Sequence, residues 1–128
     1  MASSDFNLHE PINNVTITWA SGWTPETLEF ASDKTEAGIF SLNFAAIYPA
    51  GKEMKANAPI KIGTLSGVTI PGSRRYMCHA TSYPAYAPTT VIPCLITVTN
   101  DGSLYVTAQA STASIGKVCL LVDLCTIL

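Results

Sequence analysis

The sequence predicts an all-β protein, an antiparallel β-sandwich or jelly-roll-like head with about eight or nine short strands. Three observations support this fold class. No stretch of eleven or more residues places apolar side chains at helical spacing. Threonine, valine and isoleucine, which favour strands, recur along the chain. Glycine, proline and asparagine interrupt it at intervals of roughly 8 to 12 residues, the spacing of turns in such sandwiches.

The chain has 128 residues, which is enough for one domain with its own core. We expect residues 1–14 to be a flexible N-terminal segment or linker remnant and residues 15–128 to form a single β-sandwich domain. Hydrophobic residues make up 48% of the chain and charged residues only 12%, about half of the ~25% usual for a soluble domain. This scarcity of charge predicts that a partner covers part of the surface.

The predicted strands begin at residues 15–20, where apolar and polar side chains alternate until Gly22 and Pro25 interrupt the pattern. A second, short strand is expected at residues 27–31. The polar stretch at residues 32–38 predicts a loop.

Residues 39–48 form the longest predicted strand of this half, and one of its faces is expected to lie in the core. Residues 49–59 are predicted to form a loop. Residues 60–65 and 67–70 are predicted to form two short strands separated by glycines. Residues 71–90 lack a clean period and contain several prolines, so we expect this stretch to include an exposed loop. The core-facing residues of the long strand are Phe40, Leu42, Phe44, Ala46 and Tyr48.

A β-hairpin is predicted around residues 94–108. A two-residue turn of Asp101 and Gly102 would pair apolar with polar side chains across the strands. A three-residue loop that adds Asn100, with Gly102 left-handed, keeps each face consistent, so we predict this register. It gives the apolar pairs Val98 with Leu104 and Ile96 with Val106, and the polar-face pairs Thr97 with Tyr105 and Thr99 with Ser103.

The last twelve residues, KVCLLVDLCTIL, predict a strand whose two faces are both apolar. One face is expected to pack on the opposing sheet, while the other carries Cys119, Leu121, Cys125 and Ile127. Leaving such side chains in water would forgo about 1.5 to 3 kcal/mol each. We therefore expect copies of the chain to cover this second face as an oligomer interface. The alternative is a central strand covered on both faces within one chain.

Charge and hydropathy argue against nucleic-acid and membrane partners. The net charge is −2 and the seven lysines and arginines are dispersed, so no basic surface is expected to bind phosphates. No apolar run reaches the ~20 residues of a membrane helix, and the N-terminus lacks the pattern of a signal peptide. We expect a soluble protein made in the cytoplasm, without membrane insertion.

The four cysteines, Cys78, Cys94, Cys119 and Cys125, lack the spacing of metal ligands, and the isolated acidic residues offer no metal shell. No metal site and no cofactor are therefore expected. The prediction is that all four are buried thiols that pack as small apolar residues. A disulfide between Cys78 and Cys94 is the alternative.

No catalytic pattern appears in the sequence. There is no G-x-S-x-G elbow, and only His9 and His79 are available as imidazole bases. A dyad of His79 with Cys94 is less expected than a core thiol beside a loop histidine. Glu26 and Glu29 are three residues apart on a predicted strand and so point to opposite faces, which does not suit sugar hydrolysis. We expect a protein that is not an enzyme.

Three stretches together resemble the C-terminal head modules of bacteriophage tail-fibre and receptor-binding proteins. In these modules a Gly-Trp corner precedes a strand, a G-T-L…P segment precedes a variable loop, and an I-T-x-x-x-D-G-x-L-Y-V hairpin follows. The run IPGSRRY departs from the LP-x-G-Y-R-P run of many relatives. The matching positions are Gly22 and Trp23, then Gly63, Thr64, Leu65 and Pro71, then Ile96, Thr97, Asp101, Gly102, Leu104, Tyr105 and Val106.

The resemblance implies a trimeric head on the virion that attaches it to a host, often through a surface saccharide. The alternative is a purely structural virion component, such as a capsid decoration, head fibre or trimerisation module, without its own ligand. The stiff aromatic side chains of Tyr83 and Tyr86 and the guanidinium groups of Arg74 and Arg75 are candidate saccharide contacts, and Trp23 is a further one. Packing within the fold or against another chain is the competing role for these aromatic residues.

Overall fold

A computed structural model of the chain describes residues 11–25, 31–35, 39–49, 52–83, 86–113 and 115–127. These residues form ten strands of one antiparallel sheet and no helix, which confirms the all-β class. The strands are β1 Pro11–Asn14, β2 Thr16–Trp19, β3 Thr24–Pro25, β4 Ala31–Thr35, β5 Ile39–Ile47, β6 Ile60–Ser66, β7 Arg74–Ser82, β8 Val91–Val98, β9 Ser103–Ala108 and β10 Val118–Ile127.

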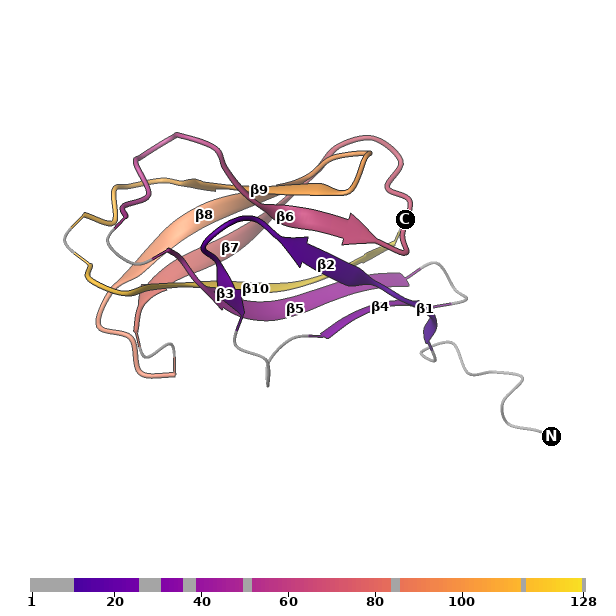
Figure 1. Cartoon of the computed structure of the whole chain (residues 1–128), viewed down its shortest axis with the longest axis horizontal. Helices are drawn as coiled ribbons and strands as arrows, with labels where there is room; N and C mark the ends of the chain where they lie inside the picture. The colour runs from indigo at the N-terminus through magenta and orange to yellow at the C-terminus, as the bar shows by residue number, and fades with distance from the viewer. Residues whose placement is uncertain are drawn as a thin grey trace.

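The sheet curls into a nearly closed sandwich. Its strand order is β1-β4-β5-β10-β7-β8-β9-β6-β2, and the short β3 pairs with β5 outside this path. The first and last strands of the order, β1 and β2, are consecutive in the chain and are joined at Val15, so one extended segment connects the two edges. Figure 1 shows β2 beside β6 on one side and leading to β1 beside β4 on the other.

The core lies between the two layers of this curled sheet. Strand β5 and the residue that follows it, Tyr48, supply the predicted face from Phe40 to Tyr48, and all five of its inward side chains are buried. Strand β8 alternates cleanly, with every second residue from Ile92 to Val98 buried. Trp23 and Tyr48 meet edge to face at 5.1 Å between ring centroids, and Gly22, with φ of 88°, forms the predicted corner before Trp23.

Two strands occupy regions for which the sequence predicts loops or a linker. The expectation of a loop at residues 32–38 is wrong for 32–35, which belong to β4 and pair with both β1 and β5 through the backbone. Polar composition hides a strand of this kind, because ladder hydrogen bonds do not require apolar side chains. Strand β1 begins at Pro11, so the sheet starts within the predicted N-terminal segment. Most of the short strand predicted at 27–31 lies outside the described residues.

Residues 71–90 include the expected exposed loop at 86–90, but β7 occupies Arg74–Ser82 within the same stretch, where no strand was predicted. Its inward side chains include the small Cys78 and Ala80, while the large apolar Met77 points outward, so the sequence shows no alternation. The predicted strand at 67–70 is absent from the sheet. Gly67, with φ of 90°, turns the chain there, and Ile70 still packs into the core.

The hairpin of β8 and β9 has the predicted register. Ile96 pairs with Val106, Thr97 with Tyr105, and Val98 with Leu104. The turn is the expected three-residue loop, since the Thr99 N–H donates to the Ser103 carbonyl at 2.9 Å and Gly102 has φ of 87°. The alternation of apolar residues was thus sufficient to fix both partners and turn.

Candidate functional site

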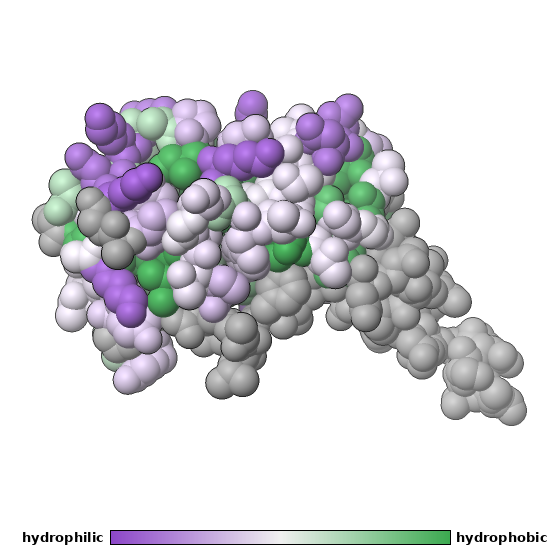
Figure 2. Space-filling model, in the orientation of Figure 1, coloured by the Kyte–Doolittle hydropathy of each residue, from purple (hydrophilic) through white to green (hydrophobic). Residues whose placement is uncertain are grey.

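The outward face of β10, β7, β8 and β9 carries most of the exposed large apolar side chains in the described residues. Met77 and Leu95 are direct partners across β7 and β8, and they are 61% and 41% exposed. Val91 lies further along β8 and is exposed too. On the face that Figure 2 shows, hydrophobic residues occur in small patches separated by polar ones. We call the outward surface of these four strands the outer face.

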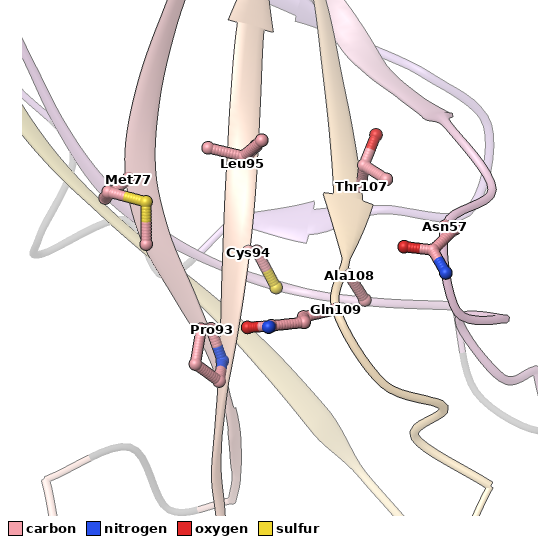
Figure 3. A pocket seen from close by; sticks show the side chains of 8 residues that line it. All are labelled: Asn57, Met77, Pro93, Cys94, Leu95, Thr107, Ala108 and Gln109. Atoms are coloured by element: carbon pink, nitrogen blue, oxygen red, sulfur yellow. The ribbon is translucent and has the colours of Figure 1, made fainter.

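A hollow of about 380 Å³ opens on the outer face beside β8. Figure 3 shows that its wall combines apolar side chains from β7 and β8 with the amides of Asn57 and Gln109 and the hydroxyl of Thr107. We call it the β8 hollow. Such a mixture of an apolar wall and a few hydrogen-bonding groups is typical of small-ligand sites. The residues around it are Asn57, Met77, Pro93, Cys94, Leu95, Thr107, Ala108 and Gln109.

Pro93 explains why the sheet opens here. The Gln109 N–H donates to the Pro93 carbonyl at 3.0 Å. In an antiparallel ladder, a pair of this kind normally exchanges two hydrogen bonds. Proline has no N–H to return the second one, and β9 ends at Ala108, one residue before this pair. The chain therefore leaves the sheet at Gln109 and exposes its amide at the mouth of the hollow.

Asn57 reaches the hollow from the loop at residues 52–59, which is fixed at two points. Met54 is fully buried, its N–H donates to the Thr112 hydroxyl at 2.8 Å, and the Thr112 N–H donates to the Met54 carbonyl at 3.1 Å. The Asn57 N–H donates to the Ala108 carbonyl at 2.8 Å. Asn57 adopts a left-handed conformation with φ of 61°, which asparagine tolerates better than most residues. The backbone that carries the Asn57 side chain is therefore positioned before any ligand arrives.

A second hollow, of about 480 Å³, lies between β10 and β7 on the same face. Met77 and Leu121 supply its apolar side chains, and Asn43, His79 and Asp123 supply polar ones. We call it the β10 hollow. Met77 contributes to both hollows, so they are neighbours on one continuous surface.

The structure places Trp23 in the core rather than on the surface. Its side chain is 7% exposed, and its indole N–H donates to the Lys61 carbonyl at 3.2 Å. An indole held in this way stabilises the corner after β2. The indole packs edge to face with Tyr48, and its burial keeps it from a ligand at the surface.

The other predicted ligand residues are not brought together. Arg74 and Arg75 lie at the start of β7, whereas Tyr83 and Tyr86 follow its end. Eight residues of strand separate Arg75 from Tyr83, which is about 26 Å at ~3.3 Å per residue. The Arg74 guanidinium donates to the Ile127 carbonyl at 3.4 Å. The arginines and tyrosines therefore cannot contact the same small ligand.

The two tyrosines differ in their surroundings. Tyr83 is 45% exposed, with the Lys117 ammonium 4.0 Å from its ring centroid and its N–H donating to the Lys117 carbonyl at 3.1 Å. Tyr86 is 90% exposed. The Ser82 hydroxyl accepts hydrogen bonds from the Thr89 and Thr90 N–H groups, which fixes the base of the loop that carries Tyr86.

The predicted interface residues of β10 are covered to different degrees. Cys119 is fully buried within the chain, and Leu121 is half-buried beside Ala45 and His79. Cys125 is exposed and Ile127 is 71% exposed. The first half of the second face is thus covered by the chain itself, as in the alternative of a central strand, and the second half is open.

All four cysteines are free thiols, and three of them are buried as predicted. The exception is Cys125, because the β10 face that carries it is open at this end. A hydrogen bond between Cys78 and Cys94 raises the pKa of Cys78, and burial raises it further. The same hydrogen bond lowers the pKa of Cys94, against the effect of burial.

Sequence reasoning missed Asn57, Met77, Pro93, Leu95 and Gln109. The available signal was in β8, where the outward residues Val91, Pro93 and Leu95 are as apolar as the inward ones. This is the same two-faced pattern that drew attention to the last strand. Across the residues described, no group of three or more histidine, cysteine or acidic side chains could hold a metal ion. No helix long and apolar enough to cross a membrane occurs in this part of the chain.

No protein-family model and no curated protein matches the sequence. A search of solved structures finds the head domain of phage bIL170, reported among the receptor-binding domains of lactococcal phages, with a TM-score of 0.59 and 18% sequence identity. The match covers 90% of this chain and 99% of that one. At this identity the likeness concerns the fold, and it confirms the fold predicted from the sequence resemblance. The chain therefore has the fold of a phage receptor-binding head domain.

Proposed function

We propose that this protein is a non-enzymatic head domain of a virion appendage, either a tail fibre or a receptor-binding protein, that attaches the virion to a saccharide of the host surface. The observation that carries the proposal is the preformed β8 hollow on a fold shared with a phage receptor-binding head. On this proposal the protein resides on the virion and is made in the host cytoplasm.

The chemistry of the β8 hollow suits a saccharide. The amides of Asn57 and Gln109 both donate and accept hydrogen bonds, as neighbouring sugar hydroxyls require. Pro93 and Leu95, both exposed on the outward side of β8, offer an apolar surface for the C–H face of a sugar ring. The hollow contains no charged side chain, which favours a neutral saccharide over a phosphate or sulfate ester.

The proposal includes assembly of three copies, as the resemblance to phage heads implies. It is supported by the low share of charged residues, 12%, and by the exposed apolar side chains on the outer face. We assign the interface to the open half of β10, with Leu121, Cys125 and Ile127, together with the neighbouring Met77. The exposed carboxylate of Asp123 lies on the same face. Cys119 is excluded from this interface because its own chain covers it.

The test measures binding of the purified chain to an array of bacterial surface saccharides and to intact host cells. Replacing Asn57 and Gln109 together by alanine should weaken binding by roughly ten- to hundred-fold, since each lost hydrogen bond is worth about 0.5–1.5 kcal/mol. The matched control is Thr16→Ala, which changes an exposed side chain on β2. Binding of the double variant at the wild-type level would remove the β8 hollow from the proposal.

The loop tyrosines are tested separately with Tyr83→Ala combined with Tyr86→Ala. Loss of binding with an unchanged melting temperature would assign the loop to the ligand site. Unchanged binding would leave these tyrosines with a packing role. A wild-type chain that binds no saccharide and no host envelope fraction would contradict the attachment function and favour a purely structural virion component.

A further inference from the structure

Cys78 on β7 and Cys94 on β8 lie directly opposite each other in the antiparallel ladder. Both side chains are 2% exposed and belong to the inward face. The register of the two strands runs without a shift from the pair of Arg74 and Val98 to the pair of Thr81 and Val91. The two cysteines are therefore held opposite each other by eight consecutive residue pairs.

The type of pair follows from a hydrogen bond at the end of the ladder. The Ser82 N–H donates to the Thr90 carbonyl at 3.0 Å, which marks these residues as a hydrogen-bonded pair. Such pairs recur at every second position, so Cys78 and Cys94 form one as well. Their Cα atoms are then about 5.5 Å apart. This separation lies within the roughly 4.4–6.8 Å that a disulfide spans.

The two thiols form a hydrogen bond with each other, and this bond shifts their pKa values in opposite directions. The hydrogen bond from Cys78 favours the thiolate of Cys94, which lowers the pKa of Cys94. The protonated Cys94 thiol donates in turn to the Ile92 carbonyl at 3.4 Å. Cys94 is also among the residues around the β8 hollow, although its side chain faces inward, so the hollow brings a small reagent close to this part of β8 (Figure 3).

We infer that Cys78 and Cys94 are a disulfide-forming pair, which a small disulfide oxidant converts into a cross-strand bond within the folded protein. The Cys94 thiolate attacks one sulfur of the oxidant, forms a mixed disulfide and releases one thiol. Cys78 then loses its proton and attacks the Cys94 sulfur, which releases the second thiol. Two protein thiols lose two electrons and two protons, and the oxidant disulfide is reduced to two thiols. The bond would join β7 to β8 below the loop that carries Tyr86.

The test treats the folded Cys125→Ser chain with hydroxyethyl disulfide at about pH 8, near the pKa of ~8.5 of a free thiol. The substitution removes the exposed thiol. After alkylation of the unfolded chain, trypsin produces one peptide, residues 76–117, that contains both Cys78 and Cys94, because no lysine or arginine lies between Arg75 and Lys117. We expect this peptide to be lighter by two hydrogens and to carry no alkyl group, whereas Cys119 in the next peptide is alkylated.

Two variants separate the proposed pair from general oxidation. Cys78→Ala leaves Cys94 without a partner, so peptide 76–117 should instead retain the mixed disulfide with the reagent. Cys119→Ser, the matched control for a buried thiol outside the pair, should keep the two-hydrogen loss. Alkylation of both cysteines after treatment of the folded protein, or a loss that appears only after unfolding, would overturn the inference. The peptide masses do not depend on any attachment function.

Discussion

At the scale of single residues, Gly102 is the most constrained position of the β8–β9 turn. Its φ is 87°, and a Cβ would lie 2.6 Å from the Leu65 carbonyl oxygen. Gly102→Ala should lower the free energy of unfolding by at least about 2 kcal/mol, because the left-handed backbone and the clash each destabilise the folded variant. Gly72 has φ of 80° with nothing within 4 Å, so Gly72→Ala isolates the backbone cost of roughly 1–2 kcal/mol. If urea unfolding shows that Gly102→Ala and Gly72→Ala lose the same free energy of unfolding, the clash with the Leu65 carbonyl is relieved in the variant.

Asp101, in the same turn, makes the stability depend on pH. Its carboxylate accepts hydrogen bonds from the Thr99 hydroxyl and, at 3.0 Å, from the Ser103 N–H, and these lower its pKa from 3.8 to about 2. The pKa is lower in the folded state than in the unfolded state. Ionised Asp101 therefore stabilises the fold above about pH 4, and this contribution disappears as the pH falls to about 2. Asp101→Asn should lower the melting temperature at pH 7 and show little difference near pH 2. A deficit of equal size at both pH values would contradict this linkage.

At the scale of elements, the loop at residues 52–59 depends on Thr112, which is 1% exposed. Thr112→Val keeps the shape but removes the hydroxyl that accepts the buried Met54 N–H. An unpaired buried donor costs about 1–3 kcal/mol, which urea unfolding would detect. Because this loop positions Asn57, saccharide binding should weaken too. The control is Ser111→Ala, since Ser111 is exposed: its hydroxyl donates to the Glu53 carboxylate and accepts from the Ala113 N–H, and both bonds lie at the surface. An equal loss of free energy of unfolding in Thr112→Val and Ser111→Ala would contradict the role of the buried hydrogen bond.

How far the elements could be predicted depended on whether each strand has one apolar face. In strands β5 and β9 the alternation of side chains determines burial, so the extent of β5 and the register of β9 with β8 followed from the sequence. Strand β7 has small inward residues and an outward Met77, and β4 is polar. These two strands are held by neighbours distant in the chain, and a single sequence does not reveal such pairing.

The candidate site was harder to predict than the fold for the same reason. Asn57 and Gln109 meet only because the loop at 52–59 is bonded to the end of β9. The predicted hairpin register, extended by three residues from Ile96, does place Pro93 opposite Gln109, so one half of the hollow was implicit in the sequence. Trp23 was misassigned for a different reason, because its core partner Tyr48 cannot be recognised from composition. Ligand contact by Tyr83 and Tyr86 stays a prediction.

At the scale of the whole molecule, the proposed assembly of three copies can be tested through the exposed apolar residues of the outer face. Wild-type protein should sediment as three chains of 13.6 kDa each. Met77 is 61% exposed in the single chain, so Met77→Asp should leave the fold intact. In the assembly the same position is covered, and a buried unpaired charge there should disrupt the interface. The variant should therefore sediment as a monomer. Thr16→Asp adds the same charge to an exposed position of β2 and should leave the assembly intact. A wild-type monomer, or a Met77→Asp variant that stays assembled, would show that Met77 faces water and that the low charge content has another cause.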